Sequence, residues 1–329
     1  MIEEYACVAS IPEEWDSVVG DNIYLTRKFM AMMESADDSE KRYYAVKIDG
    51  KIDTVFTTVK RNDFNLGMFS DFDKTIKITL VYVPLSVTRA GIAYGSGLSE
   101  AAEFIKKIRG YKMFLNFPDV SLSGYAKGNT CPKCALKLRW NTFDDYMRDL
   151  RSNYRYRYNK ALRKSAPLKF RYLKSGDEFT GEMYKLYENV YNKSRVRVEK
   201  LTERFFRGDC FKIFVAEDGE GIPRGFTQLL HNGDELVFEF VGLDYTVNSE
   251  YDTYLAMLLE IVRYGIENGF KTIDFGQTAD DAKLKIGCEY EYLYAMLHHS
   301  NKLVNFFLKK FAGRIECKPV TTKFDVFKS

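Results

Sequence analysis

The segment ELVFEFVGLD (Glu235–Asp244), followed by YDTYLAMLLEIVRYGIEN (251–268) and KTIDFG (271–276), decides the fold. The first and last pieces are short and apolar, which predicts buried strands. The middle piece carries an apolar stripe at helical spacing, formed by Leu255, Leu258, Leu259, Val262 and Ile266. Ser249 and Asp252 make an S-x-x-D capping pattern before this helix. The three pieces therefore predict a strand, a helix and a second strand.

The elements around these three follow from the same apolar patterns. Upstream we expect a basic helix over roughly 142–165, a strand Leu168–Leu173, a helix Asp177–Asn192, a helix from Thr202, and a hairpin that joins Phe211–Glu217 to Arg224–His231. Downstream we expect a short helix over 278–286 and a strand Tyr290–His298. This succession predicts an α/β (α+β) fold with a mixed sheet flanked by helices.

The first half of the chain repeats this pattern in a degenerate form. Three landmarks recur in the same order: LTRKF at 25–29 and LTERF at 201–205, YAVKIDG at 44–50 and IFVAEDG at 213–219, GYKMFLNF at 110–117 and GFKTIDF at 269–275. In each pair a Thr precedes a helix, Asp-Gly forms a hairpin turn, and Gly separates a helix from a buried strand. Two copies of one fold are therefore expected.

Composition excludes several classes of protein. The chain has 329 residues, 46% hydrophobic and 29% charged, with 7 prolines, which excludes a disordered chain and leaves room for two domains. No apolar run approaches about 18 residues, so no membrane-spanning helix is expected. The first ten residues, MIEEYACVAS, are acidic where a signal peptide is basic. We expect a soluble cytoplasmic protein.

Charge is concentrated in one segment. The net charge of +3 indicates no particular partner, but from Arg148 to Lys174 ten basic residues stand against one acidic residue. On a helical wheel the basic side chains form two flanks, Arg148, Arg151 and Arg155 on one and Arg157, Lys160 and Lys164 on the other. Either this helix is a solvated cover of the core, or it is an anion surface for tRNA, coenzyme A or a phosphorylated acceptor.

Cysteine and histidine usage predicts neither a disulfide framework nor a metal site. Cys131 and Cys134 form a single CxxC, which we expect to be two free thiols at a turn, with half a zinc site or a redox pair as the alternative. The 3 histidines are not spaced as metal ligands. The chain contains no Gly-Lys-Ser/Thr, GxGxxG or GxSxG motif, which argues against a kinase, a dehydrogenase and a serine hydrolase.

Three groups of residues resemble one family. They are the W-x-x-F-x-x-Y-x-x-x-L pattern from Trp140 to Leu150, the Ile273-Asp274-Phe275-Gly276 segment with Lys283 and Gly287, and the opening set Trp15, Asn22 and Phe29. They resemble Fem-type (FemAB-like) proteins of the GNAT acyltransferase superfamily. The resemblance implies tandem GNAT folds, each a mixed central sheet flanked by helices. We expect a degenerate N-terminal domain over 1–139 and a catalytic domain over 140–329.

The chain departs from ordinary GNAT acetyltransferases at one place. Those enzymes hold the coenzyme A pyrophosphate with a Gln/Arg-x-x-Gly-x-Gly/Ala loop before a helix. Here that connection is Gly242–Asp252, and it lacks the motif. The resemblance therefore leaves two donors open, acyl-CoA, slightly preferred, and aminoacyl-tRNA, with no tightly bound cofactor.

The function that the resemblance implies is transfer of an acyl or aminoacyl group from a thioester or ester donor to an amine of a small molecule or peptide. The alternative from another class is a non-catalytic GNAT-fold binding protein. Acyl transfer to an amine needs a base and a cleft for the donor. In GNAT folds the cleft lies where the strands at Glu235–Asp244 and Lys271–Phe275 part.

Candidate catalytic residues lie on these two strands. Glu239, within an apolar strand, is a candidate general base; its alternatives are a salt bridge or a solvent-facing position on the same face as Glu235. Asp274 is a candidate for a polar role in the cleft, and its alternative is to cap the helix near Thr278. Gln228, on the hairpin, is a candidate substrate contact.

The remaining candidates concern the donor. Lys283 is expected either to bind phosphates or to be a solvated helix lysine like Lys285. The other predicted co-substrate contacts are Gly276, Gln277, Arg155 and Tyr254, and Arg151 is a predicted substrate contact.

Overall fold

The structure is a computed structural model that describes residues 1–36, 38–66, 74–83, 88–194, 200–278, 280–311, 317, 319 and 321–328. The chain divides into two compact units. The first comprises Met1–Pro132 with Tyr292–Pro319, and the second comprises Lys133–Glu291 with Val320–Ser329. The sequence suggested one boundary after residue 139, whereas the chain leaves the first unit after Pro132 and returns to it at Tyr292.

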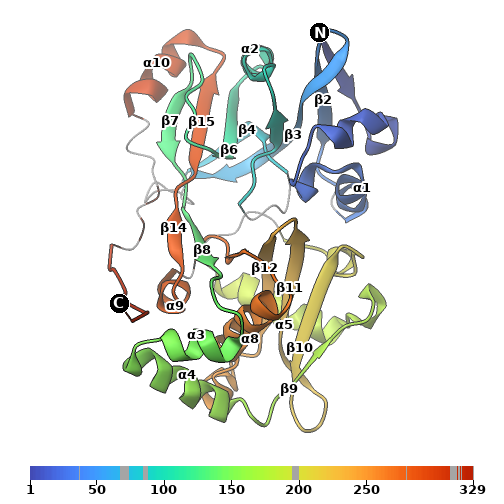
Figure 1. Cartoon of the computed structure of the whole chain (residues 1–329). Coiled ribbons are helices and arrows are strands. Elements are labelled where there is room, and N and C mark those ends of the chain that lie inside the picture. Colours follow the sequence, from blue (N-terminus) through green and yellow to red (C-terminus); the bar gives the residue numbers. More distant parts are fainter. Residues whose placement is uncertain are drawn as a thin grey trace. The chain divides into compact units, whose positions relative to one another are not determined.

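The first unit is built on one mixed sheet (Figure 1). Its helices are α1 (Arg27–Ala36), α2 (Leu98–Lys107) and α10 (Lys302–Phe311). Its strands are β1 (Ile2–Tyr5), β2 (Lys41–Ile48), β3 (Lys51–Asn65), β4 (Thr75–Val81), β5 (Ile92–Tyr94), β6 (Tyr111–Phe117), β7 (Ala126–Asn129) and β15 (Tyr294–His299). Within the described residues the strand order is β1-β2-β3-β4-β6-β15-β7, and β5 pairs with β3.

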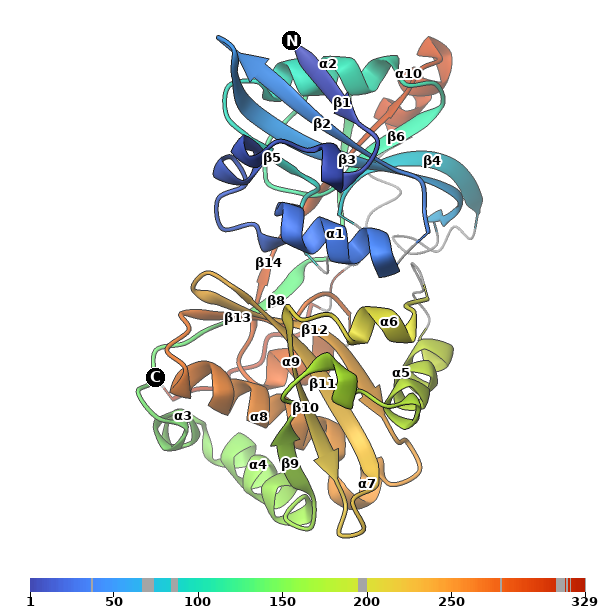
Figure 2. The same ribbon diagram turned by 90° about the vertical axis from the view of Figure 1, so that its right-hand side faces the viewer.

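The second unit has its own mixed sheet (Figure 2). Its helices are α3 (Phe143–Asp149), α4 (Ser152–Lys164), α5 (Gly181–Lys193), α6 (Glu203–Phe206), α7 (Asn248–Tyr251), α8 (Thr253–Glu267) and α9 (Asp280–Lys285). Its strands are β8 (Lys133–Lys137), β9 (Lys169–Tyr172), β10 (Phe211–Glu217), β11 (Pro223–Asn232), β12 (Glu235–Leu243), β13 (Thr272–Asp274) and β14 (Glu289–Glu291). The order across the described strands is β14-β8-β13-β12-β11-β10-β9.

The two sheets have the same plan, which confirms the fold class expected from the repeat. In each, an antiparallel meander is followed by a helix and a strand that returns parallel to the last meander strand: β6 beside β4, and β13 beside β12. The next position is filled by β15 in one unit and by β8 in the other. The single strand expected over Tyr290–His298 is therefore wrong, because β14 and β15 belong to different sheets.

The predicted basic helix over 142–165 is two helices, α3 and α4. Leu150 and Arg151 between them are extended, with ψ of 141° and 153°. The Arg151 N–H donates to the Val326 carbonyl at 2.9 Å, and Leu150 forms a β-bridge with Phe327. The backbone groups that would continue the helix bond the C-terminal segment instead, so the helix is broken.

The predicted helix Tyr251–Asn268 is also interrupted. Asp252 has φ of 49°, in the left-handed region, and separates α7 from α8. The expected cap from Ser249 and Asp252 is not formed. Instead the Asn248 side-chain oxygen accepts the Tyr254 N–H at 3.0 Å. The start of α8 is thus capped from α7.

The apolar stripe of α8 packs on one face of the second sheet. Four of its residues, Leu258, Leu259, Val262 and Ile266, are buried in one cluster with Leu236, Phe238 and Ile273 of β12 and β13. Helix α5 lies on the other face (Figure 2). There Tyr187 of α5 contacts Phe240 of β12. Burying each stripe residue contributes about 1.5–3 kcal/mol, so α8 is fixed firmly against the strands that carry the candidate site.

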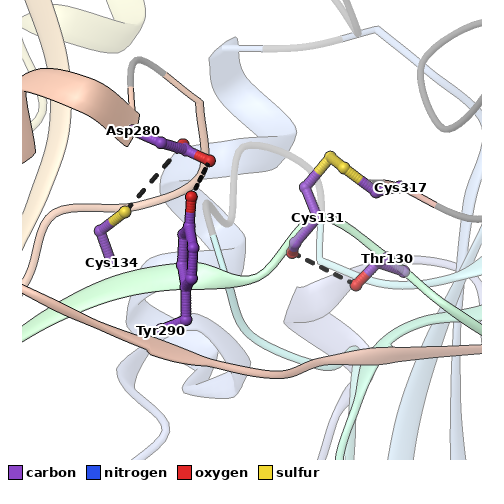
Figure 3. The surroundings of a disulfide bond; sticks show 6 residues. All are labelled: Thr130, Cys131, Cys134, Asp280, Tyr290 and Cys317. Atoms are coloured by element: carbon purple, nitrogen blue, oxygen red, sulfur yellow. Dashed lines mark hydrogen bonds between the residues drawn. A yellow bond between two sulfur atoms is a disulfide. The ribbon is translucent and has the colours of Figure 1, made fainter. Parts of the chain in front are cut away.

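The CxxC does not consist of two free thiols. Cys131 forms a disulfide with Cys317, 186 residues away, with a Cα–Cα distance of 5.0 Å (Figure 3). Cys134 is a free, buried residue of β8 whose thiol lies 4.0 Å from an Asp280 carboxylate oxygen. Sequence spacing could not reveal the partner of Cys131.

Among the described residues, no helix is long and apolar enough to cross a membrane.

Candidate functional site

The parallel strands β12 and β13 part after three residue pairs, and this parting is called the fork. The pairs are Glu235 with Thr272, Leu236 with Ile273, and Val237 with Asp274. β12 then continues to Leu243, while the chain after β13 turns to β8, where the Phe275 N–H donates to the Cys134 carbonyl at 2.8 Å. The fork opens one side of β12 at the residue after Val237.

Glu239 lies at a β-bulge just beyond the fork. On the facing strand Gln228 pairs with Phe240 and Leu229 with Phe238, so Glu239 is the extra residue. The bulge breaks the alternation that would have placed Glu239 on the face of Glu235. Glu239 is only 7% exposed, so the expected solvent-facing alternative is wrong.

Asp274 is fully buried at the end of β13. One oxygen accepts the Gly276 N–H at 2.7 Å, and the other lies 3.6 Å from the Lys133 ammonium. Lys133 also pairs with Glu235 at 3.0 Å and Glu291 at 3.1 Å. Asp274 thus shapes the turn at Gly276, where φ is 72°, and belongs to an ion-pair network centred on Lys133.

Lys283 is buried, with 4% of its surface exposed, so the solvated alternative is wrong. Its ammonium donates to the Gln277 carbonyl at 3.1 Å. Burial lowers its pKa, opposed by nearby Cys134, Cys288, Asp280 and Asp274. Lys285, on the same helix, instead pairs with Asp281 at 2.5 Å. Lys283 therefore holds the Gly276–Gln277 turn next to the fork.

Gln228 is fully buried beside the bulge. Within the described part of the chain, neither its side-chain oxygen nor its nitrogen has a hydrogen-bond partner. An unsatisfied buried amide costs about 1–3 kcal/mol. The amide nitrogen and oxygen of Gln228, which pairs with Phe240 beside the bulge, therefore remain available to a polar group that reaches this part of the sheet.

A pocket of about 370 Å³ lies at the amino end of α8. Its lining comes from α4, α7 and α8 and consists of Arg157, Lys160, Lys164, Asn248, Asp252, Tyr254 and Leu255. Lys164 donates to the Ser249 carbonyl at 2.7 Å and lies 3.4 Å from Asp252. Three cationic side chains therefore face one carboxylate, at the helix end whose dipole also favours an anion.

Tyr254 belongs to both the pocket lining and the core beneath it. Burial raises its pKa, with smaller contributions from Tyr245, Cys134 and Cys288. Cys134 and Cys288 also act on Lys283. Tyr254 therefore connects the pocket lining with the core of the second unit.

Arg151 and Arg155 do not line the pocket. Arg151 donates to the Phe327 carbonyl at 3.0 Å and lies 3.8 Å from Asp325. Arg155 donates to the Arg148 and Leu150 carbonyls at 3.1 and 3.3 Å, at the end of α3. The other flank of the helical wheel lines the pocket. The packing of α4 against α7 and α8 determines which flank lines the pocket. The helical wheel alone could not predict this.

Residues 148–284 match the family model described as an acetyltransferase (GNAT) domain. The second unit carries a GNAT domain. The matched range includes the fork, the bulge and the pocket, so all three are features of this domain. The match confirms the resemblance found in the sequence. Among curated protein sequences, none matches the chain significantly.

Solved structures share the fold of the whole chain at low identity. FemX is 12% identical with a TM-score of 0.57, covering 93% of this chain and 100% of FemX. L-PGS from Bacillus licheniformis is 11% identical with a TM-score of 0.55, covering 92% and 97%. The N-myristoyltransferase of Saccharomyces cerevisiae with bound myristoyl-CoA is 10% identical with a TM-score of 0.51, covering 90% and 80%. The shared fold therefore extends over both units of the chain.

Proposed function

We propose that the chain is an N-acyltransferase that binds the phosphates of its donor in the pocket at the amino end of α8 and transfers the acyl group at the fork. One observation carries this proposal: Arg157, Lys160 and Lys164 gather at the amino end of α8, and α7 and α8 follow β12, the strand that runs on past the fork. The GNAT domain lacks the usual phosphate loop, and the Tyr254 N–H is already capped by Asn248. Side chains of α4 supply the positive charge that such a loop would provide.

The chemistry follows from the residues at the fork. The amine nitrogen attacks the donor carbonyl carbon, a C–N bond forms, and the bond to the thiolate or alkoxide breaks. Glu239 takes the proton that the amine loses and then passes it to the departing thiolate or alkoxide, so that the carboxylate is regenerated. The Gln228 amide, which has both a donor and an acceptor, orients the reacting carbonyl or amine. Asp274 and Lys283 hold the turn that bounds the fork.

Acyl-CoA is the donor that we favour. The yeast N-myristoyltransferase that shares the fold binds myristoyl-CoA. A pocket of this volume, with three cations at a helix end, suits a compact group of phosphates. Aminoacyl-tRNA carries the same phosphate chemistry and is the second candidate, and the experiment below separates the two.

The test is calorimetric titration with coenzyme A, a panel of acyl-CoAs and charged tRNA. Lys160→Ala removes one charge-assisted contact, worth roughly 1.5–3 kcal/mol, and should weaken donor binding about ten- to a hundredfold at low salt. The matched control is Arg163→Ala, an exposed cation of the same helix outside the pocket lining, which should change the affinity less than twofold.

The outcomes separate the alternatives. Binding of acyl-CoA alone supports the first donor, and binding of charged tRNA alone supports the second. Equal loss in both variants would mean that the pocket is not the phosphate site. Binding of a donor without turnover of any amine acceptor would support the non-catalytic alternative.

A further inference from the structure

Helix α10 (Lys302–Phe311), which follows β15 in the first unit, exposes an apolar face. Its outer side chains are strongly exposed: Leu303 66%, Phe306 61%, Phe307 48% and Phe311 37%. Within the described part of the chain, Phe306, Phe307 and Phe311 are the only exposed phenylalanines. Their spacing places them along one side of the helix. Three exposed aromatic side chains of the described residues therefore lie on one short helix.

The opposite side of α10 is anchored to the first unit. The helix packs against β15 and β7 (Figure 1). The Asn305 side chain accepts the His299 N–H at 3.0 Å and donates to the Gly124 carbonyl at 3.1 Å. Asn301 caps the helix by accepting the Leu303 N–H at 2.9 Å. None of these contacts needs the outer side chains, so the fold does not account for the exposed face.

The charge of α10 indicates what covers this face. The helix carries Lys302, Lys309 and Lys310 and no acidic residue. A second copy docked by symmetry would bring identical lysines together, which is unfavourable. Anionic lipid headgroups complement them, while phenylalanine and leucine side chains enter the headgroup–acyl boundary. Lysines beside the apolar side chains can extend toward the headgroups.

We propose that α10 docks the protein on the surface of a membrane rich in anionic lipid. A helix of ten residues is about 15 Å long, half the thickness of a bilayer core of about 30 Å. It therefore lies along the interface and does not cross it. Leu303, Phe306 and Phe307 supply the apolar contact, and Lys309 and Lys310 supply the electrostatic contact.

The test is co-sedimentation of the full chain with vesicles of phosphatidylcholine containing about 30 mol% phosphatidylglycerol, compared with phosphatidylcholine alone. We expect binding to the anionic vesicles and at least tenfold weaker binding to the neutral ones. The double variant Phe306→Ser/Phe307→Ser should reduce the partition coefficient by at least tenfold. Lys309→Gln/Lys310→Gln should reduce it by about fivefold per lysine, and salt should weaken the wild type.

Controls make the result specific to α10. Tyr156→Ser removes an equally exposed aromatic residue (68%) from the basic helix α4 and should leave vesicle binding unchanged. In Phe306→Trp, vesicle addition should shift the tryptophan emission to the blue. Melting curves should be alike in all variants, because the changed side chains are exposed.

Three outcomes would overturn the proposal. One is a wild type that stays in the supernatant with anionic vesicles. Another is binding that the Phe306→Ser/Phe307→Ser change leaves intact. The third is a dimer in light scattering that this double variant converts to monomer while vesicles bind neither, which would assign the face to a second copy. All three are independent of donor binding in the GNAT domain.

Discussion

The two sheets share one strand order but differ where their parallel strands part. In the first unit β4 ends at its last parallel pair, Val81 with Phe114. In the second unit β12 runs on from the last pair to Leu243, with a bulge at Glu239. The same topology therefore gives an open fork with a buried carboxylate in one copy, and a meander strand that stops at the corresponding point in the other.

Two buried polar residues of the first unit, Lys112 and Asn116, have structural roles. The ammonium of Lys112, fully buried, donates to the Lys106 carbonyl at 3.1 Å and to the Ile108 carbonyl, beyond the end of α2. Burial lowers the pKa of Lys112 to about 8. Asn116, the sequence counterpart of Asp274, has φ of 55° and occupies a tight backbone position. The two copies of the fold therefore differ in the surroundings of their buried polar groups.

The strongest test of this difference is Glu239→Gln. If Glu239 is the base, the substitution keeps the shape of the side chain and should reduce the rate of acyl transfer by about 10²- to 10⁴-fold, with donor affinity unchanged. The measurement is single-turnover release of free thiol from an acyl-CoA in the presence of an amine.

The matched change in the first unit is Asn116→Gly, because glycine tolerates a positive φ. Transfer by this variant should remain within a factor of two of the wild type. Comparable losses in both variants would show that the first unit takes part in the chemistry.

The next largest effect is expected for Lys283, a buried lysine of the second unit. Lys283→Met removes a buried ammonium from beside Asp274 and Asp280 and should lower the free energy of unfolding by about 3 kcal/mol. Lys285→Met breaks a partly exposed pair with Asp281 and should cost no more than about 0.5 kcal/mol. Urea denaturation measures both. If Lys283→Met instead changes the free energy of unfolding little and causes a salt-dependent loss of donor affinity, Lys283 is a phosphate ligand.

The smallest effect is expected for Gln228, where one substitution should raise the stability of the protein and lower its activity. Gln228→Leu removes an unsatisfied buried amide and should raise the free energy of unfolding by about 1–3 kcal/mol while lowering the rate of transfer about tenfold. Thr57→Val in the first unit removes a buried hydroxyl that has no partner in the described residues. It should stabilise by about 1 kcal/mol without changing transfer. A Gln228→Leu variant with full activity would remove Gln228 from the site.

The local patterns of the sequence predicted the elements better than their partners. The stripe of α8 and the hairpin turns could be found because they depend on neighbouring residues. The sequence could not predict that β15 joins the sheet of the first unit and β8 the sheet of the second, because an apolar run does not indicate which sheet it joins. The break at Leu150 depends on Val326 and Phe327, far along the chain.

The candidate site shows the same limit. Glu239, Gln228 and Tyr254 could be proposed from their strand or helix. The bulge that buries Glu239 depends on register with the facing strand. The pocket flank with Lys160 depends on how α4 rotates against α8, and hydrophobic spacing left both flanks open. Tertiary contacts decide what a helical wheel leaves undecided.

The disulfide between Cys131 and Cys317 closes the chain into a ring that contains Lys133–Glu291, almost the whole second unit. A protease that cuts once within this ring opens it but releases no fragment, because the two pieces stay joined through sulfur. The nicked molecule stays in one piece until a reductant separates the two parts. Damage to the GNAT domain would thus pass unnoticed on a non-reducing gel, and the redox state of one bond decides whether a cut chain remains a single molecule.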